Sequence, residues 1–311
     1  INTRIGWYSA EMTGATEETD QQVKAGGWDG ALDFPRIQGG DLCGEVVALG
    51  DGVDGFALGR RVTCPINQPR PTPENPVGFV AIGSEYDGAF AQYCLVQAGD
   101  LYDVTEAPLS DVELAAIPCA FGTAAGLLHR AGVSQGQEVL ITGASGGVGL
   151  AAVQLAAQTG AVVAGISSTA KAGCVRDAGA TEVIARDAPL PADRFHAVID
   201  LVAGGIWPAL IDALRPGGHY AVAGAIGSPV IEADLRRIYL RDITLHGCTY
   251  QPPDVFAGLV ARVNAGHVRP LISKTYPLAR IAEAQADFIS KTHPGKLVLI
   301  PLGAGAEGAA A

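Results

Sequence analysis

The sequence is short of charged residues and has no long apolar run. Charged residues make up 17% of its 311 residues, below the roughly 25% that is typical of soluble domains. The 32 acidic and 21 basic residues give a net charge of −11, and no basic stripe runs along the chain. These features argue against a nucleic-acid partner. No apolar stretch reaches the ~20 residues needed to cross a bilayer, so no membrane-spanning helix is expected.

Closely spaced cysteines are also missing. The sequence has no CxxC pair, and its cysteines lie at least 21 positions apart, at Cys43, Cys64, Cys94, Cys119, Cys174 and Cys248. Scattered thiols in a long chain are typical of a reducing compartment, which predicts a cytoplasmic protein. The chain opens with Ile1, and its only methionine is Met12. We therefore expect the natural N-terminus to be absent from this chain.

Glycine, by contrast, is abundant, with 41 residues, and the length predicts two domains. Residues 1–115 combine glycine and proline with short alternating apolar runs, which predicts a small β-rich domain. Strands are expected in this domain at 43–50, 60–64 and 89–96, with a proline-rich loop at 68–76.

Residues 116–248 alternate between apolar, β-branched runs and helical stretches. The runs lie at 138–143, 161–167, 182–185, 196–202, 219–224 and 242–248, with helices expected at 148–160 and 206–214. This spacing predicts an α/β fold with a doubly wound parallel sheet, covered on both faces, as in a Rossmann domain. Residues 249–311 form a C-terminal segment, with helices expected at 252–265 and 278–290 and a final strand at 296–300.

A glycine-rich loop follows the first strand of this sheet and opens its first long helix, in VLITGASGGVGL (139–150). Gly146 lets the backbone approach a pyrophosphate, and Gly149 lets the helix pack closely on the strand. The helix N-terminus favours negative charge. The loop therefore predicts a dinucleotide site at Ala144, Gly146, Gly147, Val148 and Gly149. The same letters fit the short-chain dehydrogenases, but no tyrosine here is followed four positions later by lysine.

The second strand indicates which dinucleotide binds. Enzymes that use NAD place an acidic residue ~20 residues after the loop, on the ribose 2′-hydroxyl. Here the strand ends in Ser167, Ser168 and Lys171, and no carboxylate occurs before Asp177. Hydroxyls and a lysine can accept a 2′-phosphate, so NADP is favoured. The alternative is that these residues only cap the helix that starts near Ala170.

Several spaced motifs in one order resemble the medium-chain dehydrogenase/reductases, in their zinc-less quinone oxidoreductase (zeta-crystallin-like) branch. The similar stretches are 34–62, 87–96, 115–156, 214–224, 239–247 and 293–300. The resemblance implies a GroES-like catalytic domain at 1–115, a Rossmann domain that binds NADP at 116–248, and a segment at 249–311 that returns to the catalytic domain. It also implies a homodimer paired through residues 242–250.

The resemblance also bears on metal binding. Zinc-dependent relatives carry a GHE triplet, where this chain has Gly39-Gly40-Asp41. Cys119 stands at the position of a third zinc ligand, but one thiolate cannot hold zinc alone. The family's lobe of closely spaced cysteines is replaced by the proline-rich loop, so no metal site is expected.

The family position of Tyr8, in an R-x-G-x-Y segment that starts at Arg4, implies a catalytic tyrosine beside the nicotinamide. A tyrosine with no chemical role remains the alternative. By family position, Thr123, Gly224 and Ala225 lie near the nicotinamide. The segment around Tyr8 also implies that the family's first strands are missing.

Without a strong Lewis acid, the chemistry favoured is hydride delivery from NADPH to a quinone or an α,β-unsaturated carbonyl. Two alternatives stay open. One is a zinc-independent alcohol dehydrogenase or enoyl-thioester reductase of the same superfamily. The other is an NADP-binding protein without catalysis.

Overall fold

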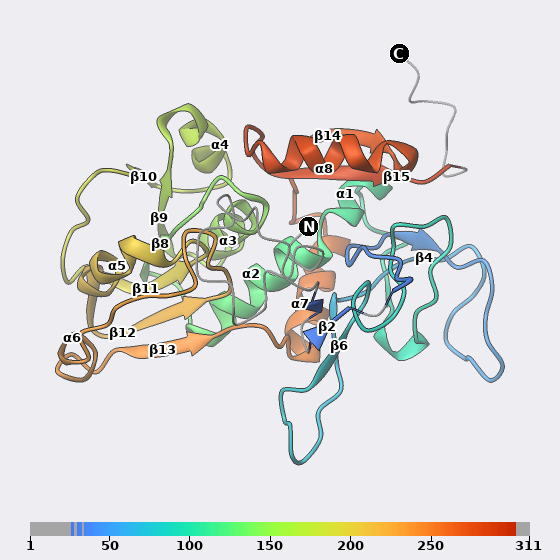
Figure 1. The fold of residues 1–311 in the computed structure, drawn as a ribbon, viewed down its shortest axis with the longest axis horizontal. Helices are drawn as coiled ribbons and strands as arrows, with labels where there is room; N and C mark the ends of the chain where they lie inside the picture. Colours follow the sequence, from blue (N-terminus) through green and yellow to red (C-terminus); the bar gives the residue numbers. More distant parts are fainter. Residues whose placement is uncertain (1–25, 28–29, 33, 303–311) are drawn as a thin grey trace.

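A computed structural model describes residues 26–27, 30–32 and 34–302 of the chain. A six-stranded sheet and a set of short β elements lie at opposite ends of this structure (Figure 1). The helix α2 (Pro118–Arg130) runs between them. Among the described residues, no helix is long and apolar enough to cross a membrane.

The large sheet has all of its strands parallel, in the order β10-β9-β8-β11-β12-β13. The order matches the nucleotide-binding Rossmann arrangement, in which the strand sequence reverses between the first and fourth strands. The predicted α/β class and the six predicted strands are therefore confirmed. In chain order the strands are β8 (Glu138–Ile141), β9 (Val162–Ser167), β10 (Glu182–Ala185), β11 (Phe195–Asp200), β12 (Leu214–Val222) and β13 (Thr244–Gly247).

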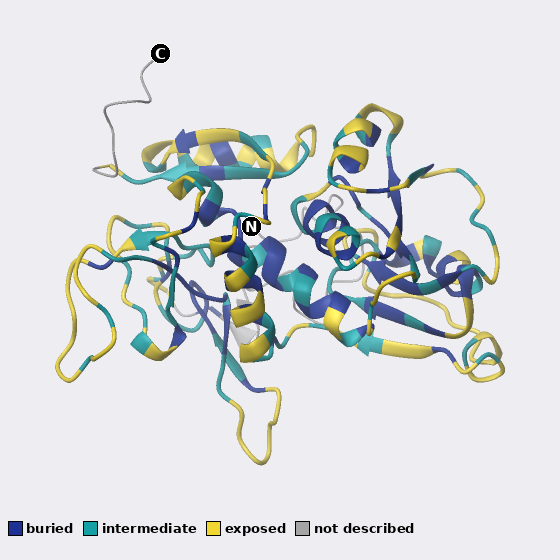
Figure 2. Cartoon of the chain, turned by 180° about the vertical axis from the view of Figure 1, so that it is seen from behind, coloured by how far each residue is buried: buried dark blue, intermediate teal, exposed yellow. Residues whose placement is uncertain are grey.

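Both faces of the inner strands of this sheet are buried, because their alternate side chains enter two separate clusters. Val139 and Ile141 of β8 pack in one cluster, and Leu140 packs in the other. The first cluster draws on α2, α3 (Gly147–Gln158) and α7 (Pro253–Asn264), and the second on α5 (Trp207–Ala213). Figure 2 shows the buried strands between these layers. Each fully buried Val or Leu contributes about 1.5–3 kcal/mol, which stabilises the frame behind the site.

Helix α2 is an element that the sequence did not predict. Gly122 and Gly126 lie in its interior, and each costs about 1 kcal/mol of helix propensity relative to alanine. Pro118 occupies the first turn, where its missing N–H costs nothing. Burial of Phe121 and Leu127 in the main cluster outweighs the glycine cost and fixes the helix.

The β-rich part contains small antiparallel sheets. β3 (Gly44–Glu45), β4 (Arg61–Thr63) and β7 (Tyr102–Asp103) form one, and β5 (Asn67–Pro69) pairs with β6 (Phe79–Ala81) in a second. β1 (Gly26–Gly27) and β2 (Gly30–Ala31) form a third pair. This part includes the predicted GroES-like domain.

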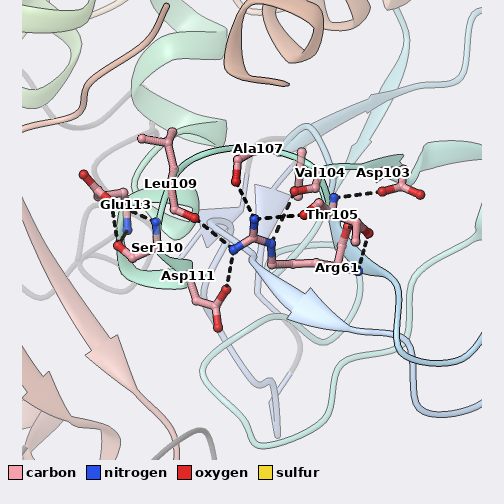
Figure 3. A network of polar contacts seen from close by, with 9 residues as sticks. All are labelled: Arg61, Asp103, Val104, Thr105, Ala107, Leu109, Ser110, Asp111 and Glu113. Atoms are coloured by element: carbon pink, nitrogen blue, oxygen red, sulfur yellow. Dashed lines mark hydrogen bonds and ion pairs between the residues drawn. The ribbon is translucent and has the colours of Figure 1, made fainter. Parts of the chain in front are cut away.

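Arg61 ties β4 to the segment that leads into α1 (Asp111–Ala115). Its guanidinium donates to the Asp111 carboxylate and to carbonyl oxygens of this segment, as Figure 3 shows. The four carbonyl acceptors are those of Val104, Thr105, Ala107 and Leu109. One planar cation therefore organises a loop that has little regular structure of its own.

Three sequence predictions in this part need correction. Residues 89–96 form no strand; their alternation does not mark a buried face, since Tyr93 is 76% and Leu95 is 87% exposed. The strand expected at 43–50 is reduced to Gly44–Glu45, after which the chain turns at Asp51. The loop expected at 68–76 begins only after Pro69, because Gln68 and Pro69 pair with β6.

The C-terminal segment follows the predicted pattern of elements. α7 packs on α2, and β14 (Ile272–Pro277) pairs in parallel with β15 (Lys296–Ile300). α8 (Ile281–Ile289) lies between these two strands in sequence. The remaining short helices are α4 (Ala172–Asp177) and α6 (Arg236–Tyr239). The domain boundaries at 115 and 248 stay a prediction.

Candidate functional site

The glycine-rich loop connects the end of β8 to the start of α3. Gly143 adopts φ +56°, a region that favours glycine. An added Cβ at Gly149 would lie 2.2 Å from the Gly143 carbonyl oxygen and 2.7 Å from the Ala144 Cα. Only glycine therefore fits at position 149, where α3 presses on the loop. Ala144 is fully buried, and its N–H donates to the Ile166 carbonyl.

Gly146 is the N-cap of α3, and Gly147 and Val148 begin its first turn. A helix leaves its first N–H groups without partners inside the helix, and its dipole favours an anion at that end. At Gly146 an added Cβ would have its nearest neighbour at 3.4 Å, so the loop leaves space beside the cap. The residues present therefore fit a phosphate group.

The residues predicted to bind a 2′-phosphate lie together at the carboxyl end of β9. Ser167 is the last residue of the strand and is 1% exposed, and its hydroxyl has no hydrogen-bond partner among the described residues. Ser168 is the N-cap of the short 3-10 helix Thr169–Lys171, yet its side chain makes no cap hydrogen bond. Ser168 and Lys171 thus stand at helix N-cap positions, as the capping alternative expects, but neither side chain makes a capping hydrogen bond.

The C-terminal segment contacts this region directly. The Lys171 Nζ donates to the Lys291 carbonyl at 2.7 Å. Gly146 forms an isolated β-bridge with Gly295, whose N–H donates to the Ser145 carbonyl at 3.3 Å. Residues 291–296, far from the loop in sequence, therefore lie against the predicted dinucleotide site.

An ion pair that the sequence did not predict lies beside Gly147. The Lys296 Nζ is 2.7 Å from the Asp41 Oδ2, and the Cys119 N–H donates to the Asp41 Oδ1 at 2.7 Å. An added Cβ at Gly147 would lie 2.9 Å from the Lys296 Cδ. Burial disfavours the ammonium charge, but Asp41 and Cys119 outweigh this effect and raise the pKa of Lys296 to about 12.

A buried carboxylate closes the end of β11. Asp200 is inaccessible to solvent and accepts hydrogen bonds from the Thr142 hydroxyl at 2.6 Å and the Tyr220 hydroxyl at 2.5 Å. The backbone N–H groups of Val202 and Ala203 also donate to it. Burial and the Asp200 charge raise the pKa of Tyr220 above its ordinary value. This network holds the loops after β8 and β11 at the switch point of the sheet.

Of the three predicted nicotinamide residues, Thr123 lines a small cavity, and Gly224 and Ala225 follow a residue that lines it. Thr123 of α2 and Ala223, the residue before Gly224, line a cavity of about 60 Å³ together with residues 248–251. An added Cβ at Gly224 would lie 2.9 Å from the Leu201 carbonyl oxygen, so β12 and the loop after β11 lie close together there. Ala225 follows directly. Tyr8 lies outside the described residues.

The residues that correspond to a zinc site do not fit a metal ion. Burial and the Asp41 charge raise the pKa of the Cys119 thiol to about 11, so this thiol is neutral at pH 7. Asp41 is already paired with Lys296. Within the described ranges, no group of three or more His, Cys, Asp or Glu side chains could hold a metal. The expected absence of a metal stays a prediction.

Together, the fold and the site define an oxidoreductase with a GroES-like domain and a Rossmann domain for a nicotinamide cofactor. Residues 11–106 match the alcohol dehydrogenase GroES-like domain family, and residues 174–299 match the zinc-binding dehydrogenase family. The chain belongs to the medium-chain dehydrogenase/reductase superfamily.

Two curated relatives span most of the chain. A zinc-type alcohol dehydrogenase-like protein of Schizosaccharomyces pombe is 30% identical over 86% of this chain and 83% of its own length. A quinone oxidoreductase of Rattus norvegicus is 28% identical over 89% of this chain and 84% of its own length. Quinone oxidoreductases are therefore among the relatives of this chain, at modest identity.

Two solved structures illustrate the range of related sites. A cobalt- and zinc-bound thermostable alcohol dehydrogenase from Pyrobaculum aerophilum is 30% identical, with a TM-score of 0.76, over 86% of this chain and 83% of that chain. A 2-octenoyl-coenzyme A carboxylase reductase was solved in complex with NADP and 2-octenoyl-coenzyme A. It is 26% identical, with a TM-score of 0.78, over 85% of this chain and 68% of that chain.

Proposed function

We propose that this protein transfers a hydride from NADPH to a quinone or an α,β-unsaturated carbonyl without a metal. The observation that carries the proposal is the small cavity lined by Thr123 and Ala223, at the carboxyl end of β12. In open parallel sheets, ligands bind in the crevice outside the carboxyl ends of the strands. An acceptor whose reacting end entered this cavity would therefore lie beside the nicotinamide end of a dinucleotide held by the glycine-rich loop.

Each part of the chain has a distinct role in this proposal. The N-terminus of α3, at Gly146, Gly147, Val148 and Gly149, holds the pyrophosphate. When bound, NADPH supplies the hydride. Thr123, Gly224 and Ala225 hold the nicotinamide against the acceptor, so that proximity and orientation provide most of the rate enhancement. Tyr8 donates a hydrogen bond, and then a proton, to the acceptor oxygen.

The choice of NADPH over NADH rests on Ser167, Ser168 and Lys171. The unpartnered Ser167 hydroxyl and the absence of a carboxylate before Asp177 support a phosphate ligand at the end of β9. The NADP-bound relative supports the same choice. The Lys171 ammonium uses one of its three donors on the Lys291 carbonyl, so it can donate to a phosphate with the others.

Metal independence rests on the residues at the zinc position. Gly40 stands where zinc-dependent relatives have histidine, and Asp41 is engaged by Lys296 and the Cys119 N–H. We expect activity to be unchanged after dialysis against a strong chelator such as EDTA, which removes zinc from dependent relatives.

A steady-state assay tests the proposal. NADPH oxidation is followed with 1,4-naphthoquinone, cyclohex-2-enone and a 2-enoyl-coenzyme A, with NADH as the comparison cofactor. Turnover of a quinone or enone, faster with NADPH, supports the proposal. Turnover of the thioester alone supports the enoyl-thioester alternative. NADPH binding by fluorescence with no turnover of any acceptor supports a non-catalytic binder.

We infer a homodimer formed through β13. This strand is the edge of the large sheet, and Leu245 on it is 47% exposed. An edge strand offers unpaired N–H and C=O groups to a second copy. Light scattering of the wild type and of Leu245→Lys tests the inference, since the charge would shift the protein toward monomer. The six free cysteines support a cytoplasmic location.

A further inference from the structure

Gln251 lines two cavities. The smaller, of about 60 Å³, also contains Asn67 and Thr123. The larger, of about 250 Å³, lies among Arg70, Asp100 and neighbouring residues, and contains none of the predicted cofactor residues. Gln251 is therefore in reach of a substrate in either cavity.

Asn67 presents a hydrogen-bond acceptor that has no donor. Its side chain is 7% exposed, and its Nδ2 donates to the Thr249 carbonyl at 3.0 Å. This bond fixes the orientation of the amide, because the nitrogen must face the carbonyl. The Oδ1 at the opposite side is buried and has no partner among the described residues.

The side-chain amide of Gln251 also has a buried oxygen without a hydrogen-bond donor among the described residues. The residue is 5% exposed, and its Oε1 is buried without a partner in the part of the chain that the structure describes. The amide lies over α2, where an added Cβ at Gly122 would come within 2.9 Å of both Nε2 and Oε1. Glycine at this position thus leaves room for the amide. A buried polar group without a partner is costly, and a ligand that donates a hydrogen bond in the cavity would remove this cost.

The charges around the cavities are already neutralised. Arg70 and Asp100 are the charged residues that line them, and the Arg70 guanidinium donates to both carboxylate oxygens of Asp100, at 2.9 and 2.5 Å. Burial raises the pKa of the Cys248 thiol in the smaller cavity to about 11, so this thiol is also neutral. The lining therefore suits an uncharged substrate better than a phosphorylated one.

We propose that Asn67 and Gln251 determine specificity, and that they select a neutral enone or quinone that carries a hydroxyl group. The hydroxyl donates to the Asn67 Oδ1, and Gln251 forms a second polar contact. This proposal rests on the proposed reductase function, because it names the substrate class of the same site. A substrate without a donor leaves both amides unpaired and is discriminated against.

The test compares hydroxylated and methylated substrates of similar size. Cyclohex-2-enones with a hydroxyl at C4, C5 or C6 are each compared with the methyl analogue, using the full chain and NADPH. For at least one position, we expect kcat/KM to favour the hydroxyl by about tenfold, as expected when a buried acceptor gains its donor. Equal or better turnover of the methyl analogue at every position would overturn the proposal.

Two variants test whether Asn67 and Gln251 cause the preference for the hydroxylated substrate. Asn67→Leu is expected to abolish it, whereas the control Asn264→Leu, which loses a similar amide-to-carbonyl bond to Asp103, should keep it. Gln251→Met should reduce the preference several-fold while leaving the melting temperature unchanged or higher, since the Oε1 has no partner among the described residues. Retention of the full preference in both Asn67→Leu and Gln251→Met would contradict the proposal.

A binding measurement separates this proposal from the proposed function. With NADPH present, 4-hydroxycyclohexanone should raise the melting temperature more than 4-methylcyclohexanone, although neither is an enone. If no enone or quinone is reduced but this difference appears and Asn67→Leu removes it, the reductase function fails and the hydroxyl site stands. If enones are reduced without any hydroxyl preference, the reductase function stands and the hydroxyl site fails.

Discussion

The Lys296 ammonium lies 2.7 Å from the Asp41 carboxylate, although the two residues are 255 positions apart. The pair joins the β-rich part to the C-terminal strand β15 beside the first turn of α3. It places a cation near the predicted pyrophosphate site, in a protein whose net charge is −11. Because Asp41 neutralises this cation, the positive field at that site is local and comes from the N-terminus of α3 and from Lys171.

Lys296→Met should destabilise the protein at pH 7, because Asp41 loses its ionic partner. We expect a loss of about 1–2 kcal/mol, which lies between the values for exposed and for fully buried ion pairs. The side chains are 21% and 27% exposed. Urea unfolding measures the loss, and Asp41→Asn/Lys296→Met should cost less than the two single changes added together. Lys274→Met, which breaks an exposed pair with Asp287, is the control and should change little.

The same pair predicts a pH dependence. The folded pKa of Lys296, about 12, lies above its ordinary value of 10.5. The contribution of the Lys296 charge to the free energy of unfolding is therefore complete below pH 10.5 and is lost as the pH rises toward 12. The difference in unfolding free energy between wild type and Lys296→Met should be constant from pH 6 to 9. A difference that fell steadily across that range would show that the charge is not the cause.

Two glycines of the loop should respond differently to alanine. Gly149→Ala places a Cβ 2.2 Å from a backbone oxygen, so it should lower stability by about 3 kcal/mol or more. Gly146→Ala has 3.4 Å of room and should fold normally. If position 146 faces the pyrophosphate, that variant should still bind NADPH at least tenfold more weakly, by fluorescence titration. Wild-type affinity in Gly146→Ala would place the phosphate elsewhere.

Arg61→Lys should destabilise the protein by about 2–3 kcal/mol, since lysine has three donors on a single nitrogen and cannot replace the fork that binds four carbonyls. Arg60→Lys is the matched control. Arg60 makes one partly exposed ion pair with Asp103, so the loss should stay below about 1 kcal/mol. Equal melting temperatures for the two variants would show that the network in Figure 3 contributes little.

All six thiols should react slowly with iodoacetamide in the native protein at pH 7.5. Burial raises the pKa of each one, to about 12 for Cys43 and Cys64 and to about 11 for Cys119 and Cys248. Intact-mass measurements should show labelling at least tenfold slower than in urea. Rapid labelling of Cys119 in the native protein would contradict the raised pKa of this thiol.

The Rossmann half was predictable because its signal is local. Continuous apolar runs such as 138–143, followed by a glycine-rich turn and a helix, define each unit without reference to distant residues. The β-rich half was less predictable, since its strands are only two or three residues long and depend on contacts such as those of Arg61. The alternation at 89–96 suggested a buried face, yet Leu95 is 87% exposed.

The residues of the candidate site also divide into those that the sequence indicates and those that only the structure shows. Gly149 could be proposed from the sequence because a motif names it, and Ser167 because no carboxylate follows its strand before Asp177. Asp41 and Lys296 both lie in motifs, but nothing in their spacing indicates that they pair. Asn67 and Gln251 carry no pattern at all, because their importance follows from the missing partners of their buried amides. Such a property exists only in three dimensions.

The most direct test of the account is the fate of the hydride. NADPH deuterated at C4 of the nicotinamide, in each of its two stereochemical forms, is incubated with cyclohex-2-enone in ordinary water. The account predicts cyclohexanone with one deuterium at C3 from one of the two forms, at an unchanged rate after EDTA dialysis. Cyclohexanone without deuterium from both forms, or no reduction of any enone or quinone, would contradict it.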